Sequence, residues 1–225
     1  MQKAFPEKLF HTRWTSILQK MSPESQPRFV RKHCRHCLHP SCVSVCPVGA
    51  LKKTKEGYVR YDQGICLGCR YCLLACPYGI PRYEWNSRIP AVTKCTLCFS
   101  RIAEGKEPAC TEACLEKATI FGKRDDLIQE AKKRIRDNPD RYSGKVYGEY
   151  ELGGTSVLYI SDIELDFLGL GRNFSEKPMP KLTWDILKQT PAIAGVMGVS
   201  MSFFYWFTKR KKSVVKTEKK KTTKK

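Results

Sequence analysis

Twelve cysteines constrain this chain more than any other feature, because all of them lie between residues 34 and 114. They form three groups of four, and a proline directly follows the last cysteine of the first two groups. A stretch this rich in cysteine is expected to bind a group that replaces part of a hydrophobic core. The three groups are Cys34, Cys37, Cys42 and Cys46; Cys66, Cys69, Cys72 and Cys76; and Cys95, Cys98, Cys110 and Cys114.

The spacing within the groups predicts iron–sulfur ligation. The second group reads C-x2-C-x2-C-x3-C-P, a run that binds [4Fe–4S] clusters, and the first has the same frame with two extra residues. Three closely spaced cysteines ligate one cube from a single loop, while the fourth serves the neighbouring cube in two-cluster proteins. The spacing therefore predicts one cube on Cys34, Cys37, Cys42 and Cys76, and a second on Cys66, Cys69, Cys72 and Cys46. Gly68 suits a loop that requires a positive φ.

Three other uses of these cysteines fit less well. A disulfide framework is typical of small secreted domains and does not explain the placed C-P dipeptides. A thioredoxin-like C-x-x-C is disfavoured, because no βαβ pattern surrounds these cysteines. Structural zinc is bound by separated C-x2-C pairs and stays open for the third group, where a third [4Fe–4S] cluster is the main prediction.

Residues 29–82 read as an internal repeat, in which Cys46–Ala50 echoes Cys76–Ile80. The repeat predicts small strands, a short helix after each C-P dipeptide and a strand within 57–62. Residues 155–160 also read as a strand. Residues 125–137 predict an amphipathic helix, with Asp125 or Asp126 able to cap it and Asn138-Pro139 ending it.

Three of the four histidines, His33, His36 and His39, crowd the first group. Imidazole can replace thiolate in Rieske centres. Because four cysteines are already present, the histidines are expected around the cluster as hydrogen-bond donors, or on the surface.

Residues 191–207 carry no charged side chain and end in the aromatic run 203–207. Their length is at the lower limit for a helix that crosses a membrane, and Lys209, Arg210, Lys211 and Lys212 follow at once. The positive-inside rule predicts a cytoplasmic tail and a cluster domain on the periplasmic-type side. Gly195 and Gly198 allow close approach of another helix. No histidine lies beyond His39, so this helix cannot supply histidine ligands to a haem.

The net charge of +19 fits a nucleic-acid partner, but the charge is unevenly distributed along the chain. The tail, residues 209–225, holds ten Lys or Arg and one Glu, so it accounts for nearly half of the excess. Cluster thiolates add negative charge that this count omits. The tail is expected to anchor the topology and to attract anionic lipid.

The quoted runs CRHCLHPSCVSVCPVGALKK, CLGCRYCLLACPYGIPRYEW and KCTLCFSRIAEGKEPACTEAC resemble a known family, the iron–sulfur electron-transfer subunits of membrane-bound respiratory complexes. Within it, the chain is similar to HybA-type subunits of uptake [NiFe]-hydrogenases and to the β subunit of formate dehydrogenase-N. The resemblance covers residues 28–208. It implies that electrons pass from a catalytic subunit through the clusters to a membrane subunit that handles quinone or haem.

The chain departs from that family in one respect. The family usually has sixteen cysteines and four clusters, and here neither a quartet nor a twin-arginine signal precedes Arg28. By the family pattern, Cys95, Cys98 and Cys110 would share a cube with a cysteine of that quartet, and Cys114 would serve another. Three accounts stay open: one cube on all four cysteines of the third group, a cysteine from another chain, or an earlier start of the protein.

The predicted fold is α+β: a ferredoxin-like multi-[4Fe–4S] domain with small strands and short helices, plus one C-terminal transmembrane helix. We find no nucleophile, phosphate loop or acid/base pair in the sequence, so no substrate site is predicted. The rival functions are an independent soluble polyferredoxin and a zinc-dependent nucleic-acid-binding protein. The predicted segments are an N-terminal arm (1–28), the cluster domain (29–122), a helix and extension (123–189), the transmembrane helix (190–208) and the Lys-rich tail (209–225).

Overall fold

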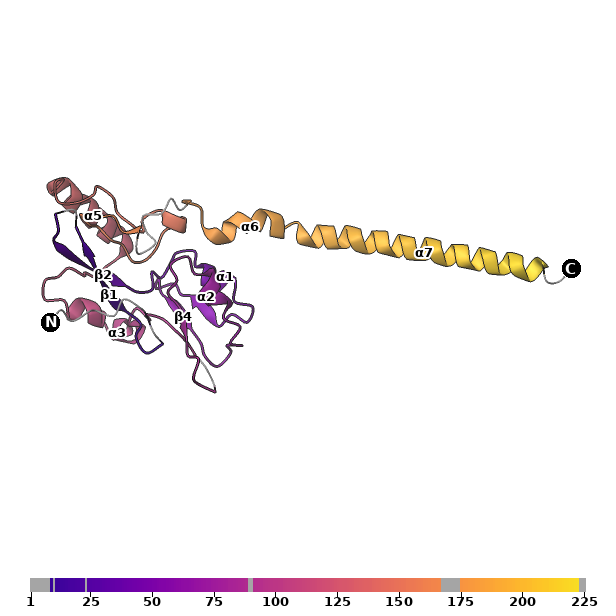
Figure 1. Ribbon diagram of the computed structural model, residues 1–225, viewed down its shortest axis with the longest axis horizontal. Helices are drawn as coiled ribbons and strands as arrows, with labels where there is room; N and C mark the ends of the chain where they lie inside the picture. Colours follow the sequence, from indigo (N-terminus) through magenta and orange to yellow (C-terminus); the bar gives the residue numbers. More distant parts are fainter. Residues whose placement is uncertain (1–8, 10, 23, 89–90, 167–174, 223–225) are drawn as a thin grey trace. The chain divides into compact units, whose positions relative to one another are not determined.

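The computed structural model describes residues 9, 11–22, 24–88, 91–166 and 175–222 of the chain. It divides into two compact units, residues 1–180 and residues 181–225, and each is considered by itself (Figure 1). Parts of the predicted arm, extension and tail, namely residues 1–8, 10, 23, 167–174 and 223–225, lie outside the described residues.

The first unit contains three small antiparallel sheets of two strands each. They pair β1 (Ser16–Met21) with β2 (Pro27–Lys32), β3 (Leu51–Lys53) with β4 (Val59–Tyr61), and β5 (Arg82–Tyr83) with β6 (Val92–Thr93). The predicted strand within 57–62 is confirmed as β4. The stretch predicted as an arm contributes β1, whose register with β2 runs from Ser16 opposite Lys32 to Met21 opposite Pro27.

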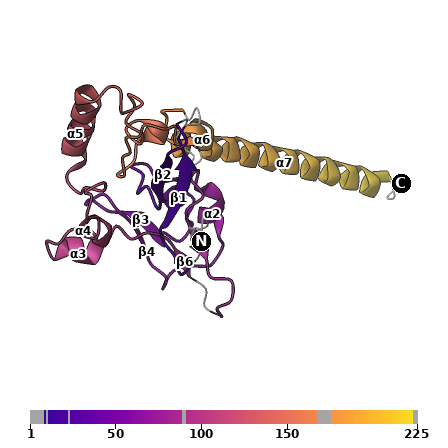
Figure 2. The ribbon, with the colours of Figure 1, turned by 60° about the vertical axis from the view of Figure 1, so that its left-hand side comes forward.

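Short helices carry the third cysteine of each group. They are α1 (Ser41–Ser44), α2 (Tyr71–Ala75) and α4 (Ala109–Glu112), and α3 (Phe99–Ala103) follows Cys98 directly. The prediction of a helix after each C-P was wrong, because the helices precede the dipeptide. Proline removes a backbone N–H donor, so the chain turns there and the repeat continues into β3 or β5. Arg101 of α3 pairs with Glu112 of α4, and Figure 2 shows the two helices side by side.

The predicted amphipathic helix is confirmed as α5 (Arg124–Asp137). Its N-cap is Lys123, with no side-chain cap bond, so the predicted capping by Asp125 or Asp126 was wrong. The two aspartates lie in the first turn, where the helix dipole favours negative charge. Asn138 ends the helix as predicted.

No strand forms over residues 155–160, where one was predicted. Its backbone groups bond to separate partners: Thr155 N–H to Gly148 O at 2.8 Å, and Ser156 N–H to Arg35 O at 3.1 Å. A single bridge joins Tyr159 to Tyr147. The strand propensity of this segment is overridden, because no one neighbouring strand is available to pair along its length.

Two clusters of buried side chains make up the core, and both end at cysteines. Cys34, Cys37 and Cys76 pack against the first cluster, whose buried members are Leu9, Tyr78, Ile80, Tyr147, Leu152, Ile163 and Leu165. Cys42, Cys46 and Cys66 pack against the second, whose buried members are Leu51, Val59, Cys72 and Val92. The cysteines are thus part of the hydrophobic interior of this unit.

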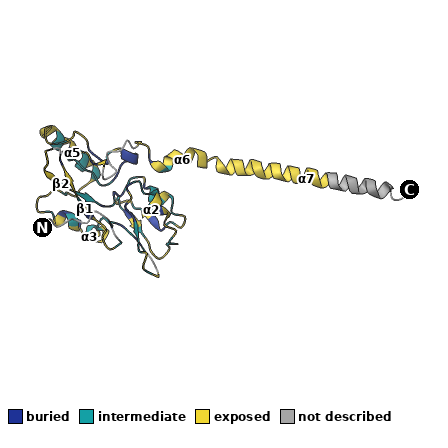
Figure 3. Ribbon diagram, in the orientation of Figure 1, coloured by how far each residue is buried: buried dark blue, intermediate teal, exposed yellow. Residues whose placement is uncertain are grey.

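The second unit holds the end of α6 (Met179–Leu187) and all of α7 (Thr190–Thr222). The described apolar side chains of α7 are exposed, as Figure 3 shows. Among the described residues, Met179–Arg210 is the one helical stretch long and apolar enough to cross a membrane, with a mean hydropathy of 1.2. The helix continues through Thr222 into the Lys-rich segment that was predicted as a tail.

Replacing Gly148 by alanine should destabilise the first unit more than the same change at Gly144. Both glycines have a positive φ, but a Cβ at Gly148 would lie 2.5 Å from Thr155 Oγ1 and 2.7 Å from Val157 O. At Gly144 a Cβ would meet nothing within 4 Å. We expect the steric conflict to add about 1–3 kcal/mol of destabilisation, seen as a lower guanidinium midpoint of tryptophan fluorescence. Equal midpoints for the two variants would contradict this packing.

Candidate metal centre

The three C-x2-C loops share one backbone geometry. The residue two positions after the first cysteine is left-handed in each, with φ of 48° at His36, 68° at Gly68 and 58° at Leu97. The prediction of a positive φ at Gly68 is therefore confirmed. The Gly68 N–H donates to Cys66 Sγ, and the Leu97 N–H to Cys95 Sγ, both at 3.4 Å. Such bonds favour the thiolate form of the sulfur, which is the form that binds metal.

The turn after the fourth cysteine is also repeated three times. Gly49, Gly79 and Lys117 have φ of 64°, 55° and 47° at the same position. Their N–H groups donate to the carbonyl of the preceding cysteine at 3.2, 3.0 and 3.0 Å respectively. The sequence analysis missed the third turn, because Leu115 stands where the others have proline and Lys117 where they have glycine. An apolar residue four positions after each cysteine was the available signal.

The first two groups exchange their last cysteines in space. The pKa of Cys37 is raised by burial and then by three thiols, those of Cys34, Cys76 and Cys42. The pKa of Cys72 is raised to about 11 by burial and then by Cys66, Cys69 and Cys46. In both cases, the thiols that raise the pKa belong to the same predicted cube, in which each run receives the last cysteine of the other run.

The surroundings of the second set agree with this grouping. Cys46, Cys66, Cys69 and Cys72 all line one small cavity, together with apolar side chains such as Leu51 and Val92. Helices α1 and α2, which carry the third cysteines of the two runs, pack against each other. The structure therefore brings the predicted sets together, and the iron ligands themselves stay a prediction.

The chemistry of these donors fits a metal cluster. Burial raises the pKa of Cys42 to about 12, and the neighbouring thiols Cys34 and Cys76 add to the effect. Four adjacent, largely buried thiols cannot all ionise unless positive charge enters among them. Iron would supply that charge, and its binding would release the thiol protons.

Two of the crowded histidines are buried and already bonded. His33 Nε2 lies 2.8 Å from Arg31 Nη2, and its Nδ1 lies 3.1 Å from the Tyr159 hydroxyl. His36 Nδ1 accepts from the Val59 N–H at 3.0 Å, and burial lowers the pKa of His36 to about 2. His36 is therefore neutral with its proton on Nε2, and a hydrogen bond to the backbone of Cys95 opposes part of the fall in its pKa. His39 is exposed.

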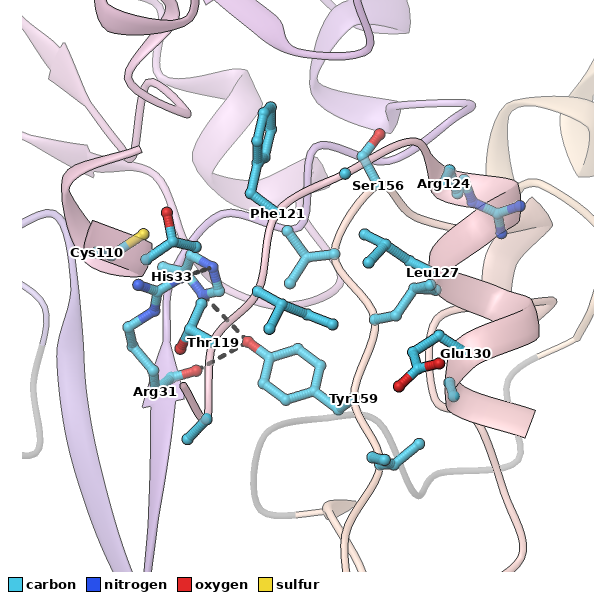
Figure 4. A pocket seen from close by; sticks show the side chains of 18 of the residues that line it. Arg31, His33, Cys110, Thr119, Phe121, Arg124, Leu127, Glu130, Ser156 and Tyr159 are labelled. Carbon is cyan, nitrogen blue, oxygen red and sulfur yellow. Dashed lines mark hydrogen bonds between the residues drawn. The ribbon is translucent and has the colours of Figure 1, made fainter. Parts of the chain in front are cut away.

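The third group borders a larger cavity of about 1290 Å³. Figure 4 shows Cys110 at its edge, with side chains of β2, α5 and the segment around Tyr159 lining the rest. The pKa of Cys95 is raised to about 11, first by burial and to a lesser extent by the Cys34 thiol of the first group. Within the described residues, no three His, Cys, Asp or Glu side chains converge tightly enough to hold a single metal ion.

Comparison with known proteins identifies the cysteine-rich segment. Residues 26–124 match the family described as the 4Fe-4S dicluster domain. The match confirms the prediction of [4Fe–4S] cofactors and of a ferredoxin-like domain with small strands and short helices.

Three relatives extend the comparison beyond this domain. A protein of Nitratidesulfovibrio vulgaris strain Hildenborough is 40% identical over 193 residues, which is 85% of this chain and 52% of that protein. The "Hydrogenase-2 operon protein HybA" of Escherichia coli O157:H7 is 40% identical over 185 residues, 70% of this chain and 56% of its own length. The "Formate dehydrogenase iron-sulfur subunit" of Haemophilus influenzae is 34% identical over 167 residues, 72% and 53% respectively. The chain spans about half the length of these relatives.

Replacing Lys117 by glycine should stabilise the third group. A left-handed conformation destabilises the folded state by about 1–2 kcal/mol when the residue has a Cβ, and glycine removes this strain. Glycine also loses more conformational entropy on folding, which costs about 0.5–1 kcal/mol. The net gain of about 0.5 kcal/mol should raise the guanidinium midpoint of the anaerobic protein. Glu116→Gly is the control, because Glu116 is exposed and has no positive φ, and it should lower the midpoint. A fall for both variants would contradict the shared turn.

Proposed function

We propose that this chain is an electron-transfer subunit of a membrane-bound oxidoreductase complex. It relays electrons through [4Fe–4S] clusters between a catalytic subunit and a membrane subunit that handles quinone or haem. The observation that carries the proposal is the pairing of thiols from opposite cysteine runs inside a 4Fe-4S dicluster domain. The relatives' names, a hydrogenase operon protein and a formate dehydrogenase iron-sulfur subunit, support membership of such a complex.

The chain's own residues bury and hold the clusters, and the clusters supply one-electron transfer. Cys34, Cys37, Cys42 and Cys76 hold one cube, and Cys66, Cys69, Cys72 and Cys46 hold the other. Backbone donors support both sets, since the Ala50 N–H bonds Cys46 Sγ at 3.2 Å and the pKa of Cys76, raised by burial, is lowered in part by backbone donors at Ile80, Tyr78 and Gly79. Such donors offset cluster charge and tune the potential.

The third group holds a further [4Fe–4S] cluster in this proposal. Its loop at Cys95 and its turn after Cys114 repeat the geometry of the other two groups. The pKa of Cys95 is raised by burial and, to a lesser extent, by the Cys34 thiol, which supports a position of this group next to the first cube. The cavity beside Cys110 leaves room for a ligand from another part of the protein or from a partner.

The exposed apolar side chains of α7 support a membrane anchor. Ile193, Val196 and Val199 expose between 52 and 72% of their surface, so lipid or another membrane helix must cover them. The chain then crosses the bilayer once, with the basic residues after Thr208 on the cytoplasmic side and the cluster domain on the periplasmic-type side. Because this helix lacks histidine, any haem ligands come from a partner subunit.

Metal analysis of the full chain, purified anaerobically, tests the function. We expect about twelve irons and as many acid-labile sulfides per chain, at four of each per cube. The brown colour should bleach when a reductant is added. A colourless protein that contains zinc would overturn the proposal and favour a zinc-dependent fold.

A reciprocal pair of substitutions tests the crossed ligation. Cys76→Ser should damage the cube built on Cys34, Cys37 and Cys42, and Cys46→Ser should damage the other. Each variant serves as the control of its partner, because the two cysteines hold equivalent positions in the repeat. The electron paramagnetic resonance (EPR) spectrum of each reduced variant should lack a different one of two signals. Loss of the cube within the same run would contradict the exchange.

The anchor is tested by a charge placed in the apolar part of α7. Val199→Arg adds about 2.5–3.5 kcal/mol to insertion at the centre of a membrane span. We expect it to release the protein from alkaline-washed membranes without changing the iron content. Thr208→Arg, at the end of the apolar run, is the matched control and should stay bound. If both variants stay in the membrane fraction, α7 is not the anchor.

A further inference from the structure

Buried positive charge gathers around one of the two cysteine sets. Among the basic residues that the structure describes, two are buried: Arg35 and Lys94, with 1% and 6% of their surface exposed. Arg35 lies between Cys34 and Cys37 in the sequence and interacts electrostatically with both. Lys94 acts in the same way on Cys42, and also on Cys95 of the third group. Both therefore lie beside the set formed by Cys34, Cys37, Cys42 and Cys76.

Packing holds the Arg35 side chain in place. Its Nη1 donates to the Tyr159 hydroxyl, and its guanidinium carbon lies 4.4 Å from the Tyr159 ring centroid and 5.8 Å from that of Tyr78. Its Nε and Nη2 are buried and have no described partner. A guanidinium fixed on aromatic rings, with two donors left over, can bond a further acceptor without moving.

Lys94 and Lys53 are held by backbone oxygens. Lys94 Nζ donates to Val59 O at 2.5 Å and to Cys95 O at 3.2 Å. Lys53, which is half-buried, donates to His36 O at 2.8 Å and to Gly57 O at 2.7 Å. Lys53 also interacts electrostatically with Cys37 and Cys34.

No carboxylate neutralises these three cations in the described part of the chain, where the ion pairs join other residues. An unpaired buried charge is strongly unfavourable, so a buried cation needs an anion nearby. A cube with four thiolates is an anionic group, and its set of thiols is what these cations surround. The cysteine set and the cations therefore compensate each other once the cube is bound.

The second set has a different environment. The largest effects on Cys72 come from burial and from the other three thiols of its set. Arg70, next to Cys69, is exposed and lies over the rings of Tyr83 and Trp85 at 5.3 and 4.9 Å. Water and salt screen an exposed charge of this kind far more than a buried one.

We propose that Arg35, supported by Lys94 and Lys53, sets the order of the two potentials. The cube on Cys34, Cys37, Cys42 and Cys76 has the higher reduction potential, and an electron shared by the pair rests there. Reduction adds one electron and no proton to the cube, and the electron comes from the neighbouring cube. The extra negative charge is stabilised more by buried cations than by screened ones. This inference rests on the ligand sets of the proposed function.

Redox titration of the full-length, iron-loaded protein tests this order. Dithionite is the reductant, EPR reports each reduced cube, and Cys76→Ser and Cys46→Ser assign the signals. In the unsubstituted protein, the signal lost in Cys76→Ser should appear at the higher potential. Arg35→Met should lower that potential by at least a tenfold change in the reduction equilibrium, which is 59 mV for one electron.

Two control variants separate charge from packing. Arg35→Lys keeps the charge and should retain most of the potential, while Arg70→Met removes the exposed charge beside the second set and should change neither potential appreciably. If Arg35→Met fails to assemble its clusters, Lys53→Met removes a half-buried charge from the same region and should lower the same potential by a smaller amount.

The outcomes distinguish this inference from the function on which it rests. An unsubstituted protein without iron would overturn both. An iron-loaded protein in which the signal lost in Cys46→Ser has the higher potential overturns only the inference. Unchanged potentials in iron-loaded Arg35→Met, or in Lys53→Met where Arg35→Met does not assemble, do the same.

Discussion

Thiols from two separate cysteine runs meet inside one small interior, and the first unit depends on how their charge is balanced. Cysteines pack against both clusters of buried apolar side chains, so their sulfur atoms form part of the core. Burial and the neighbouring thiols raise the pKa of Cys42 and Cys72, so these side chains favour the neutral thiol unless positive charge lies among them. Binding of the metal is thereby coupled to the packing of the fold.

The two cysteine sets differ in what surrounds them, although their loops are nearly the same. Each set has a left-handed residue in the C-x2-C loop and a left-handed residue in the turn after the last cysteine. Around the first set, however, the interior contains Arg35, Lys94 and two buried histidines, while the second set packs mainly against apolar side chains and its Cys69 is exposed. One repeated scaffold can in this way give its two metal sites different electrostatic properties.

The second unit presents the opposite situation to the first. Its helices expose nearly all of the apolar side chains that are described, and the first unit supplies its own core. An exposed apolar surface of this length is stable only when lipid or protein covers it. The exposed apolar helix and the cluster domain are therefore stabilised in different ways within one chain.

The sequence by itself determined the local features, because they depend on a few adjacent residues. The spacing of the cysteines, the positive φ at Gly68, the helix α5 and the apolar run before Lys209 were all readable from residue type and order. The crossed cysteine sets were also predicted, since the run itself implies that its last thiol points away, and as iron ligands they stay a prediction.

Only the tertiary structure decided the features that join distant segments. The turn after Cys114 could not be recognised, because Lys117 adopts a conformation that its residue type does not favour. The absence of a strand at 155–160 follows from bonds to Gly148 and Arg35, which no local pattern encodes. The burial of Arg35 and Lys94 is of the same kind, since nothing in the order of residues distinguishes these two from the other basic side chains. Charge environment depends on which segments pack together, and it was therefore settled by the fold.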